Sequence, residues 1–296
     1  MLYGSPFLRY KRNMGALDNI NWYPGHMKKT RDLIQENLKL VDIVCELLDA
    51  RIPISSRNPD IKKLAGNKPM ITILNKSDLA DEEETRLWSK KLSENGEKVL
   101  ILNSNSGEGV KKFYSLLEQT RDEKNRDAVR KKSLRLMIVG IPNVGKSSLI
   151  NRLSGSKSAK AGNKPGVTRG KQWINLGSDI MLLDTPGILW PKFDDETGLN
   201  LAFCGSIRDE IMDLDSLGLE LIGRLCSSYP EYMKERYKLD EILETPLENM
   251  EAIALKRGFI LSGKRIDYTR CARTVIDEFR AGTIGRISLE RSCDDA

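Results

Sequence analysis

The sequence contains no apolar run that approaches the roughly 20 residues a membrane-spanning helix needs. It has no pair of cysteines in C-x-x-C spacing, so we expect no zinc site. Its five cysteines are scattered along the chain, which favours reduced thiols and a cytoplasmic location. His26 is the single histidine, and a lone histidine is more often structural than catalytic.

Acidic residues are absent from one long stretch. Between Asp127 and Asp179 there are 11 Lys and Arg and no Asp or Glu. Residues 1–200 hold 34 basic against 24 acidic residues, whereas residues 201–296 hold 14 against 18. The basic stretch is equally consistent with a solvated surface around a phosphate site and with a face that binds RNA phosphates.

Short apolar runs alternate with helical patterns through the first two thirds of the chain. The expected strands cover 41–48, 69–74, 98–102 and 134–139, followed by a ribbon of 172–176 and 179–183. The expected helices cover 28–39, 81–95, 109–121 and 146–153. This alternation predicts an α/β fold with a mostly parallel sheet covered by helices on both faces.

The pattern becomes helical towards the C-terminus, with helices expected over 217–226, 247–256 and 268–280. In the last of these, Tyr268, Ala272, Val275, Ile276 and Phe279 follow the 3.6-residue period of a helix with one buried face. We therefore predict three segments. Residues 1–14 form an extension without order (a targeting segment is the weaker alternative), 15–204 an α/β domain and 205–296 a small all-α domain.

Residues 140–147 match the pattern GxxxxGK[ST], after an apolar strand and before a helix, which is the context of a phosphate loop. The backbone N–H groups of such a loop and the start of its helix cradle phosphates. Lys146 would bridge the β- and γ-phosphates, and the Ser147 hydroxyl would bind Mg²⁺. The pattern predicts a P-loop NTPase fold. The residues expected to hold the phosphates are Asn143, Val144, Gly145, Lys146, Ser147 and Ser148.

A second motif, Asn75-Lys76-Ser77-Asp78, follows another expected strand. The Asp78 carboxylate can accept from guanine N1–H and N2–H₂ together, a donor pair that adenine does not offer. The Lys76 stem can lie on the base, and Asn75 can hold the loop together. A wrong base would leave a buried carboxylate unpaired, so the motif predicts a GTP/GDP site.

The remaining nucleotide motifs are shorter. Asp184 ends an apolar strand and is expected to hold Mg²⁺ through water, while the Gly187 N–H would meet the γ-phosphate. Thr168 is the sole threonine between Gly155 and Asp184 and therefore the candidate Mg²⁺ ligand of a mobile loop. The loop behind the base is assigned to Ser104, Asn105 and Ser106, on position alone.

The order of these motifs is permuted. An ordinary GTPase runs from the phosphate loop through two switches to the base-reading and base-backing loops. Here the last two, at 75–78 and 104–106, precede the first three. The permutation places the second switch directly before the C-terminal helical segment.

Position 188 holds Ile, where many GTPases have a glutamine that orients the attacking water. Isoleucine cannot hydrogen-bond water, so we expect slow turnover without a partner. His26 lies in a Pro-Gly turn leading into a helix, a setting that suits either a structural cap or a catalytic group.

These motifs make the chain resemble the YlqF/RbgA family of circularly permuted GTPases, which act in assembly of the large ribosomal subunit. The resemblance covers about residues 21–290 and includes the segments 22–27, 49–53 and 280–286 beside the nucleotide motifs. Met1 to Asn13 departs from the usual start of the family.

The resemblance implies further roles. It makes His26 a candidate catalytic residue, beside Lys146 and Gly187, and Ile188 the hydrophobic replacement of the catalytic glutamine. It makes Asn143 a candidate ligand of K⁺. It makes the C-terminal segment an RNA-contacting domain, with Arg265, Arg270, Arg273 and Arg280 as candidate contacts.

On this basis we expect a monomeric cytoplasmic GTPase that grips rRNA of the large (50S) ribosomal subunit and is released on hydrolysis. An alternative is an RNA-binding scaffold whose nucleotide site only regulates affinity. A permuted GTPase of the small subunit is a weaker alternative, because the residues before Trp22 are too few for an OB domain and a C-x-x-C module is absent.

Overall fold

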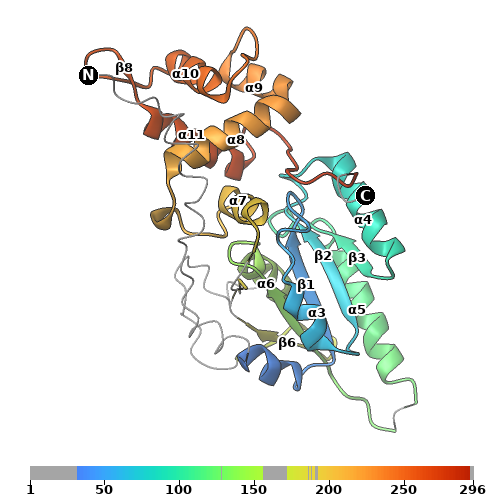
Figure 1. Ribbon diagram of the computed structural model, residues 1–296. Helices are drawn as coiled ribbons and strands as arrows, with labels where there is room; N and C mark the ends of the chain where they lie inside the picture. Colours follow the sequence, from blue (N-terminus) through green and yellow to red (C-terminus); the bar gives the residue numbers. More distant parts are fainter. Residues whose placement is uncertain are drawn as a thin grey trace. The chain divides into compact units, whose positions relative to one another are not determined.

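The computed structural model describes residues 32–127, 129–155, 172–185, 187, 189–190 and 193–293. The chain divides into two compact units (Figure 1). We call the first, residues 23–192 with 290–296, the α/β unit, and the second, which contains 193–289, the helical unit. Each is described separately.

The α/β unit is built on a sheet whose six described strands lie in the order β3-β2-β1-β4-β6-β5. All neighbours are parallel except β5 and β6, which form the expected antiparallel ribbon. The strands are β1 (Ile43–Asp49), β2 (Met70–Asn75), β3 (Lys98–Ile101), β4 (Leu134–Gly140), β5 (Gln172–Asn175) and β6 (Ile180–Asp184). The predicted mostly parallel sheet is confirmed.

Helices cover the sheet because its inner strands are apolar on both sides. Every residue of β1 is buried, as expected for a strand with helices above and below. A helix over 32–38 and α3 (Pro59–Ala65) contribute Ile34 and Ile61 to a cluster around Val44 and Val139. The remaining helices are α4 (Glu82–Glu94), α5 (Val110–Lys124) and α6 (Lys146–Ser154).

The helical unit is centred on α8 (Leu214–Ser228), which packs against α11 (Tyr268–Ala281) and α10 (Pro246–Arg257). The unit also contains α7 (Asp195–Phe203), a 3-10 turn η1 (Asp209–Ile211), α9 (Pro230–Tyr237) and a short ribbon of β7 (Ile260–Leu261) and β8 (Arg265–Ile266). A Cβ atom on Gly218 of α8 would lie 2.4 Å from the Cβ of Ala272. Glycine at this position therefore allows α8 and α11 to approach closely.

The division of the chain differs from the boundary we placed at residue 205. The helical unit begins at Phe193, before α7, whose first turn is capped by the Asp194 carboxylate. The chain leaves the helical unit at Leu289, and residues from Glu290 onward belong to the α/β unit. Sequence patterns did not indicate this return, because it depends on contacts between distant parts of the chain.

Candidate nucleotide-binding site

The predicted nucleotide motifs lie at the carboxyl ends of β2, β3, β4 and β6, which together with β1 form five adjacent strands of the sheet. Residues 75–78 follow β2, 104–106 follow β3, 140–147 follow β4, and Asp184 and Gly187 follow β6. All five strands are parallel, so their carboxyl ends share one edge of the sheet, where open α/β sheets bind ligands. The permuted order of the motifs therefore yields a single contiguous cluster of loops.

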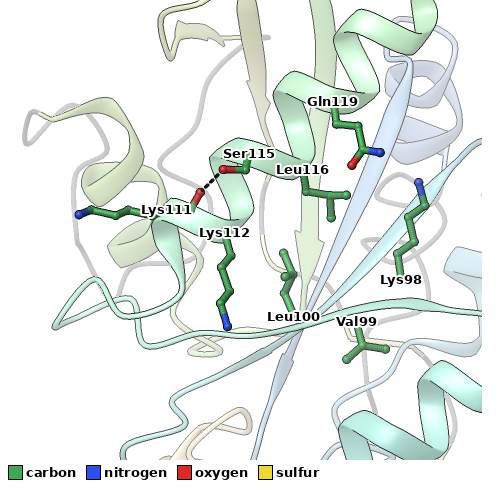
Figure 2. Close-up of a pocket in the computed structure, with 8 residues that line it drawn as sticks. All are labelled: Lys98, Val99, Leu100, Lys111, Lys112, Ser115, Leu116 and Gln119. Carbon is green, nitrogen blue, oxygen red and sulfur yellow. Dashed lines mark hydrogen bonds between the residues drawn. The ribbon is translucent and has the colours of Figure 1, made fainter.

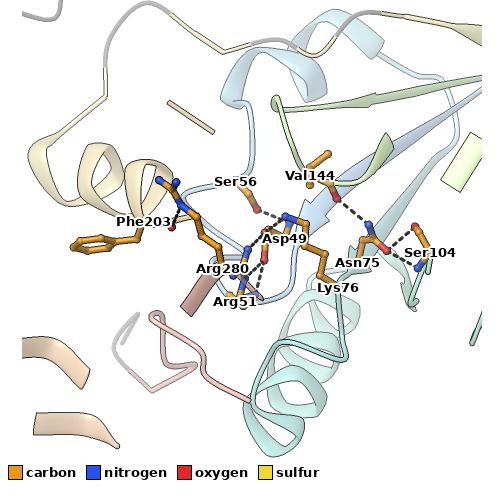
Figure 3. Close-up of polar contacts among 9 residues, drawn as sticks. All are labelled: Asp49, Arg51, Ser56, Asn75, Lys76, Ser104, Val144, Phe203 and Arg280. Atoms are coloured by element: carbon orange, nitrogen blue, oxygen red, sulfur yellow. Dashed lines mark hydrogen bonds and ion pairs between the residues drawn. The ribbon is translucent and has the colours of Figure 1, made fainter. Parts of the chain in front are cut away.

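The Asn75 side chain connects three of these loops (Figure 3). Its Nδ2 donates to the Val144 carbonyl of the phosphate loop at 2.8 Å. Its Oδ1 accepts from the Ser104 backbone N–H at 3.1 Å and from the Ser104 hydroxyl at 2.7 Å. Asn75 is buried, so each bond replaces water that the amide would otherwise bind. The base-reading, base-backing and phosphate loops are held in one arrangement by this amide.

The phosphate loop has the backbone that close approach of a phosphate requires. Gly145 lies at φ 98°, in the left-handed region, and directly precedes α6. Val144 is buried, whereas Asn143, at φ 59°, is exposed at the tip of the loop. Ser147 and Ser148 lie in the first turn of α6, where backbone N–H groups point towards a bound anion.

Lys146 is the first residue of α6 and is partly buried. Burial lowers the pKa of Lys146 to about 8, and the nearby Asp184 carboxylate offsets part of this effect. A bound polyphosphate would supply additional negative charge and would favour the protonated ammonium. The electrostatics of the site therefore suit a phosphate ligand next to Lys146.

Asp184 and Gly187 border the phosphate loop. The intervening Thr185 hydroxyl donates to the Ile138 carbonyl of β4 at 2.7 Å, which fixes the end of β6 beside the start of the loop. A Cβ on Gly187 would come within 3.1 Å of Cα of Pro142. Ser147 and Asp184 supply the hydroxyl and carboxylate oxygens that suit Mg²⁺. His26, Thr168 and Ile188, the other residues predicted for this site, lie outside the described residues.

Lys76 has a partner that the motif did not predict. Its Nζ lies 3.0 Å from Oδ2 of Asp49, the last residue of β1. Asp49 also accepts from Arg51 Nε at 3.0 Å and from Arg51 Nη2 at 2.9 Å. Burial alone would raise the pKa of the Asp49 carboxyl, but the Arg51 and Lys76 charges outweigh it and hold that pKa well below its usual value. The sequence signal that could have indicated this pair is Asp49-Ala50-Arg51 at the end of a buried strand.

The base-backing loop is stabilised by Asn103, which precedes it, and by Arg152 of α6. The Asn103 side chain accepts from the backbone N–H groups of Asn105 and Ser106, at 2.8 and 3.1 Å. Arg152 of α6 donates to the carbonyls of Ser104 and Asn105. Asn105, Ser106 and, in the base-reading loop, Asp78 are exposed, so their side chains are available to a ligand.

An open groove of about 520 Å³ lies elsewhere on the α/β unit, between the edge strand β3 and α5 (Figure 2). None of the predicted nucleotide residues lines it. The residues that do are Lys98, Val99, Leu100, Lys111, Lys112, Ser115, Leu116 and Gln119. Lysines beside a sheet edge are a common protection against unwanted strand pairing, and this is how we interpret the groove.

The four arginines predicted to contact RNA have different surroundings in the helical unit. Arg280 donates to the carbonyls of Phe203 and Ala202 and forms a bidentate pair with Asp209. Arg280 therefore connects α11 to α7 and to η1. Arg270 lies over the Phe259 ring, with 4.8 Å from its Cζ to the ring centroid. Arg265 and Arg273 are exposed.

Comparison with known proteins agrees with this geometry. A family model described as 50S ribosome-binding GTPase matches residues 135–249. Ribosome biogenesis GTPase A of Priestia megaterium is 47% identical over 277 residues, covering 92% of this chain and 96% of the relative. The chain belongs to the ribosome biogenesis GTPase A (YlqF/RbgA) family.

Less similar relatives also match this chain. Ribosome biogenesis GTPase A of Thermotoga maritima is 31% identical, with 93% of this chain and 95% of the relative covered. Mitochondrial ribosome-associated GTPase 1 of Mus musculus is 36% identical, with 93% and 91% covered. Solved structures of GDP-bound and GNP-bound YlqF, the latter from T. maritima, are each 27% identical with TM-scores of 0.60 and 0.61. The alignments cover 88% and 89% of this chain and 98% of each solved chain.

Membership of the YlqF/RbgA family shows a P-loop GTPase of ribosome assembly with a helical C-terminal region. GTP and GDP are accordingly its nucleotides. Within the part of the chain that the structure describes, no helix has the length and apolarity required to cross a bilayer.

Proposed function

We propose that this GTPase binds the assembling large ribosomal subunit and couples GTP hydrolysis to late maturation of that subunit and to its own release. The observation that carries the nucleotide part is the Asn75 amide, which joins the base-reading, base-backing and phosphate loops. The subunit part is supported by the matched family model and by the relatives named for ribosome biogenesis.

In the proposed site, Asp78 reads guanine while Lys76 lies on the base. Lys146 bridges the β- and γ-phosphates, and the phosphate-loop N–H groups from Asn143 to Ser148 hold the chain of phosphates. Mg²⁺ would be held by Ser147 and Thr168 directly and by Asp184 through water. The Gly187 N–H contacts the γ-phosphate.

Hydrolysis in this proposal does not use a glutamine, because position 188 is Ile. Asn143 at the exposed tip of the phosphate loop is the proposed ligand of K⁺, whose charge would stabilise the transition state as an arginine finger does elsewhere. His26 is the proposed group that positions or activates water once the ribosomal particle is bound.

The permuted order of the motifs provides a way for hydrolysis to change RNA binding. Gly187, which would sense the γ-phosphate, is separated from the start of the helical unit at Phe193 by five residues (188–192). A change of backbone at Gly187 on hydrolysis would therefore be transmitted over a short segment. We assign rRNA binding to the helical unit, with Arg265, Arg270 and Arg273 as the proposed contacts.

The proposal includes a monomeric protein in the cytoplasm. Some relatives are named as mitochondrial, so cell fractionation with a C-terminally tagged chain is the direct test of location. Recovery with an organelle would contradict the cytoplasmic assignment and would leave the nucleotide chemistry unaffected.

The principal experiment measures GTP turnover in K⁺ and in Na⁺ buffer, with and without purified large subunits, for the wild type and His26→Ala. We expect large subunits to raise the wild-type rate severalfold, K⁺ to support a higher rate than Na⁺, and His26→Ala to abolish the stimulation with GTP binding intact. Small subunits are the matched control. If large subunits bind but the rate does not change, the protein is an RNA-binding scaffold and the release mechanism is wrong.

A further inference from the structure

The end of the chain lies on the α/β unit in a defined arrangement. The Glu290 carboxylate accepts from two consecutive backbone N–H groups, those of Ile54 at 2.6 Å and Ser55 at 2.8 Å. The Glu290 N–H donates to the Arg51 carbonyl at 3.4 Å. A carboxylate bound by two N–H groups is a strong and directional contact. We call residues 290–292 the strap.

The strap also binds α4. The Trp88 indole N–H donates to the Glu290 carbonyl at 3.1 Å, and Lys91 Nζ donates to the Ser292 carbonyl at 2.9 Å. The Ser292 N–H donates to the Glu84 carboxylate at 2.9 Å. Trp88 is fully buried, so its indole N–H depends on this carbonyl for a partner.

The two elements that the strap joins flank the base-reading loop. One is the segment 51–56, which begins two residues after Asp49. The Asp49 carboxylate receives the Lys76 ammonium at 3.0 Å. The Asp49 N–H in turn donates to the Ser56 hydroxyl at 3.0 Å, so both ends of this segment are tied to Asp49. The other is α4, which begins four residues after Asp78. Glu290 is thus linked to Lys76 by successive contacts that pass through the 51–55 segment and Asp49.

From these contacts we propose that Glu290 is a positioning residue for guanine-nucleotide binding, acting on Lys76 through the Arg51 and Asp49 pair. The inference rests on the proposed base-reading role of Lys76. Glu290 itself need not touch the nucleotide. Its carboxylate holds the 51–55 segment, the segment holds Asp49, and Asp49 holds the Lys76 ammonium so that the stem of Lys76 stays over the base.

One consequence concerns the helical unit. The chain enters that unit at Phe193, shortly after Gly187, and leaves it at Leu289, directly before the strap. The helical unit is therefore connected covalently to the phosphate-sensing segment at one end and to the strap at the other, and the strap reaches the base-reading loop only through hydrogen bonds. Binding of RNA to the helical unit could therefore affect both the phosphate-sensing segment at Gly187 and the base-reading loop at 75–78.

The test is a double-mutant cycle on the full chain, with fluorescent GDP as the probe. Glu290→Gln keeps the size of the side chain but replaces one acceptor oxygen with a donor, so one of the two N–H contacts is lost. We expect this variant to bind GDP roughly threefold to tenfold more weakly. Glu290→Asp, which retains the carboxylate, should recover part of the affinity.

In a Lys76→Met background, Glu290→Gln should have no further effect on GDP affinity, since its influence passes through Lys76. Equal weakening in both backgrounds would mean that the strap acts on the fold in general and would overturn the inference. Unchanged affinity in Glu290→Gln alone would overturn it too. If Lys76→Met itself binds GDP normally, the proposed base-reading site fails, which is a separate outcome.

Two controls complete the design. Glu94→Gln changes an exposed carboxylate of α4 and should leave GDP affinity unchanged. Thermal unfolding of each variant checks the fold. If Glu290→Gln is unfolded, Glu290→Asp carries the test in its place, and an Asp variant that binds GDP as the wild type does would overturn the inference.

Discussion

Gly145 and Asn75 lie so close that a Cβ atom on Gly145 would come 2.3 Å from Nδ2 of Asn75. The two residues belong to loops that follow different strands, yet the Asn75 amide occupies the space beside the phosphate-loop backbone in order to reach the Val144 carbonyl at 2.8 Å. A glycine is required here both for this contact and for its φ of 98°.

Gly145→Ala should therefore abolish nucleotide binding. The added methyl group would displace Asn75 and strain the loop at the same time. Binding of fluorescent GDP is the measurement. The control is Gly155→Ala at the end of α6, where φ is 62° and a Cβ would meet nothing within 4 Å. Similar affinity for the two variants would contradict the account of the Asn75 contact.

Lys146 should take up a proton when nucleotide binds. Burial lowers its pKa to about 8 in the free protein, and a bound diphosphate would restore the ammonium. With Mg-GDP, uptake should be about half a proton at pH 8 and about a tenth at pH 7. Calorimetry at each pH in two buffers of different ionisation enthalpy measures this number. Uptake that is the same at pH 7 and pH 8 would exclude Lys146 as its source.

Arg280→Ala should destabilise the helical unit by about 1–2 kcal/mol, because it removes the donor of the Phe203 carbonyl and the partner of the partly exposed Asp209 carboxylate. Urea unfolding followed by circular dichroism measures the change. Arg273→Ala, at an exposed position of the same helix, should change stability by less than about 0.5 kcal/mol. Should Arg280→Ala instead retain its stability and lose affinity for rRNA, Arg280 would be a direct RNA contact.

Glu46 should make the stability of the α/β unit depend on pH. Burial in the middle of β1 raises the pKa of Glu46 to about 7, although the charge of Arg57 opposes the rise. Because the folded pKa is above the unfolded one, the contribution of Glu46 to stability is fully present below about pH 4.5 and is lost as pH rises through about 7.

Glu46→Gln, which is neutral at every pH, should therefore gain stability relative to the wild type between pH 5 and pH 8, by up to ~3 kcal/mol. Unfolding midpoints at pH 5 and pH 8 for both proteins provide the comparison. The exposed Glu94→Gln serves as the control, with no expected pH-dependent difference. A constant difference between Glu46→Gln and the wild type would show that Glu46 does not titrate in this range.

Much of the α/β unit was predictable from local patterns. Apolar runs bounded by turn residues defined β1, β2 and β4, since strands buried on both faces are apolar without interruption. The ribbon of β5 and β6 followed from its turn at Gly177 and Ser178, which have φ of 83° and 47°. The short helices α3, α7 and α9 were missed, because few residues carry their pattern.

The sequence by itself determined the chemistry of this protein and the place of that chemistry in the fold. Motif residues next to strand ends must meet at one edge of a parallel sheet, whatever their order along the chain. Only the tertiary structure decided which side chains hold those motifs in position. Three such contacts join residues that no sequence period or spacing relates. They are the ion pair of Asp49 with Lys76, the ion pair of Arg280 with Asp209, and the hydrogen bonds of Glu290 with the N–H groups of Ile54 and Ser55. Such contacts form only when folding packs distant segments of the chain together, so local sequence propensity does not predict them.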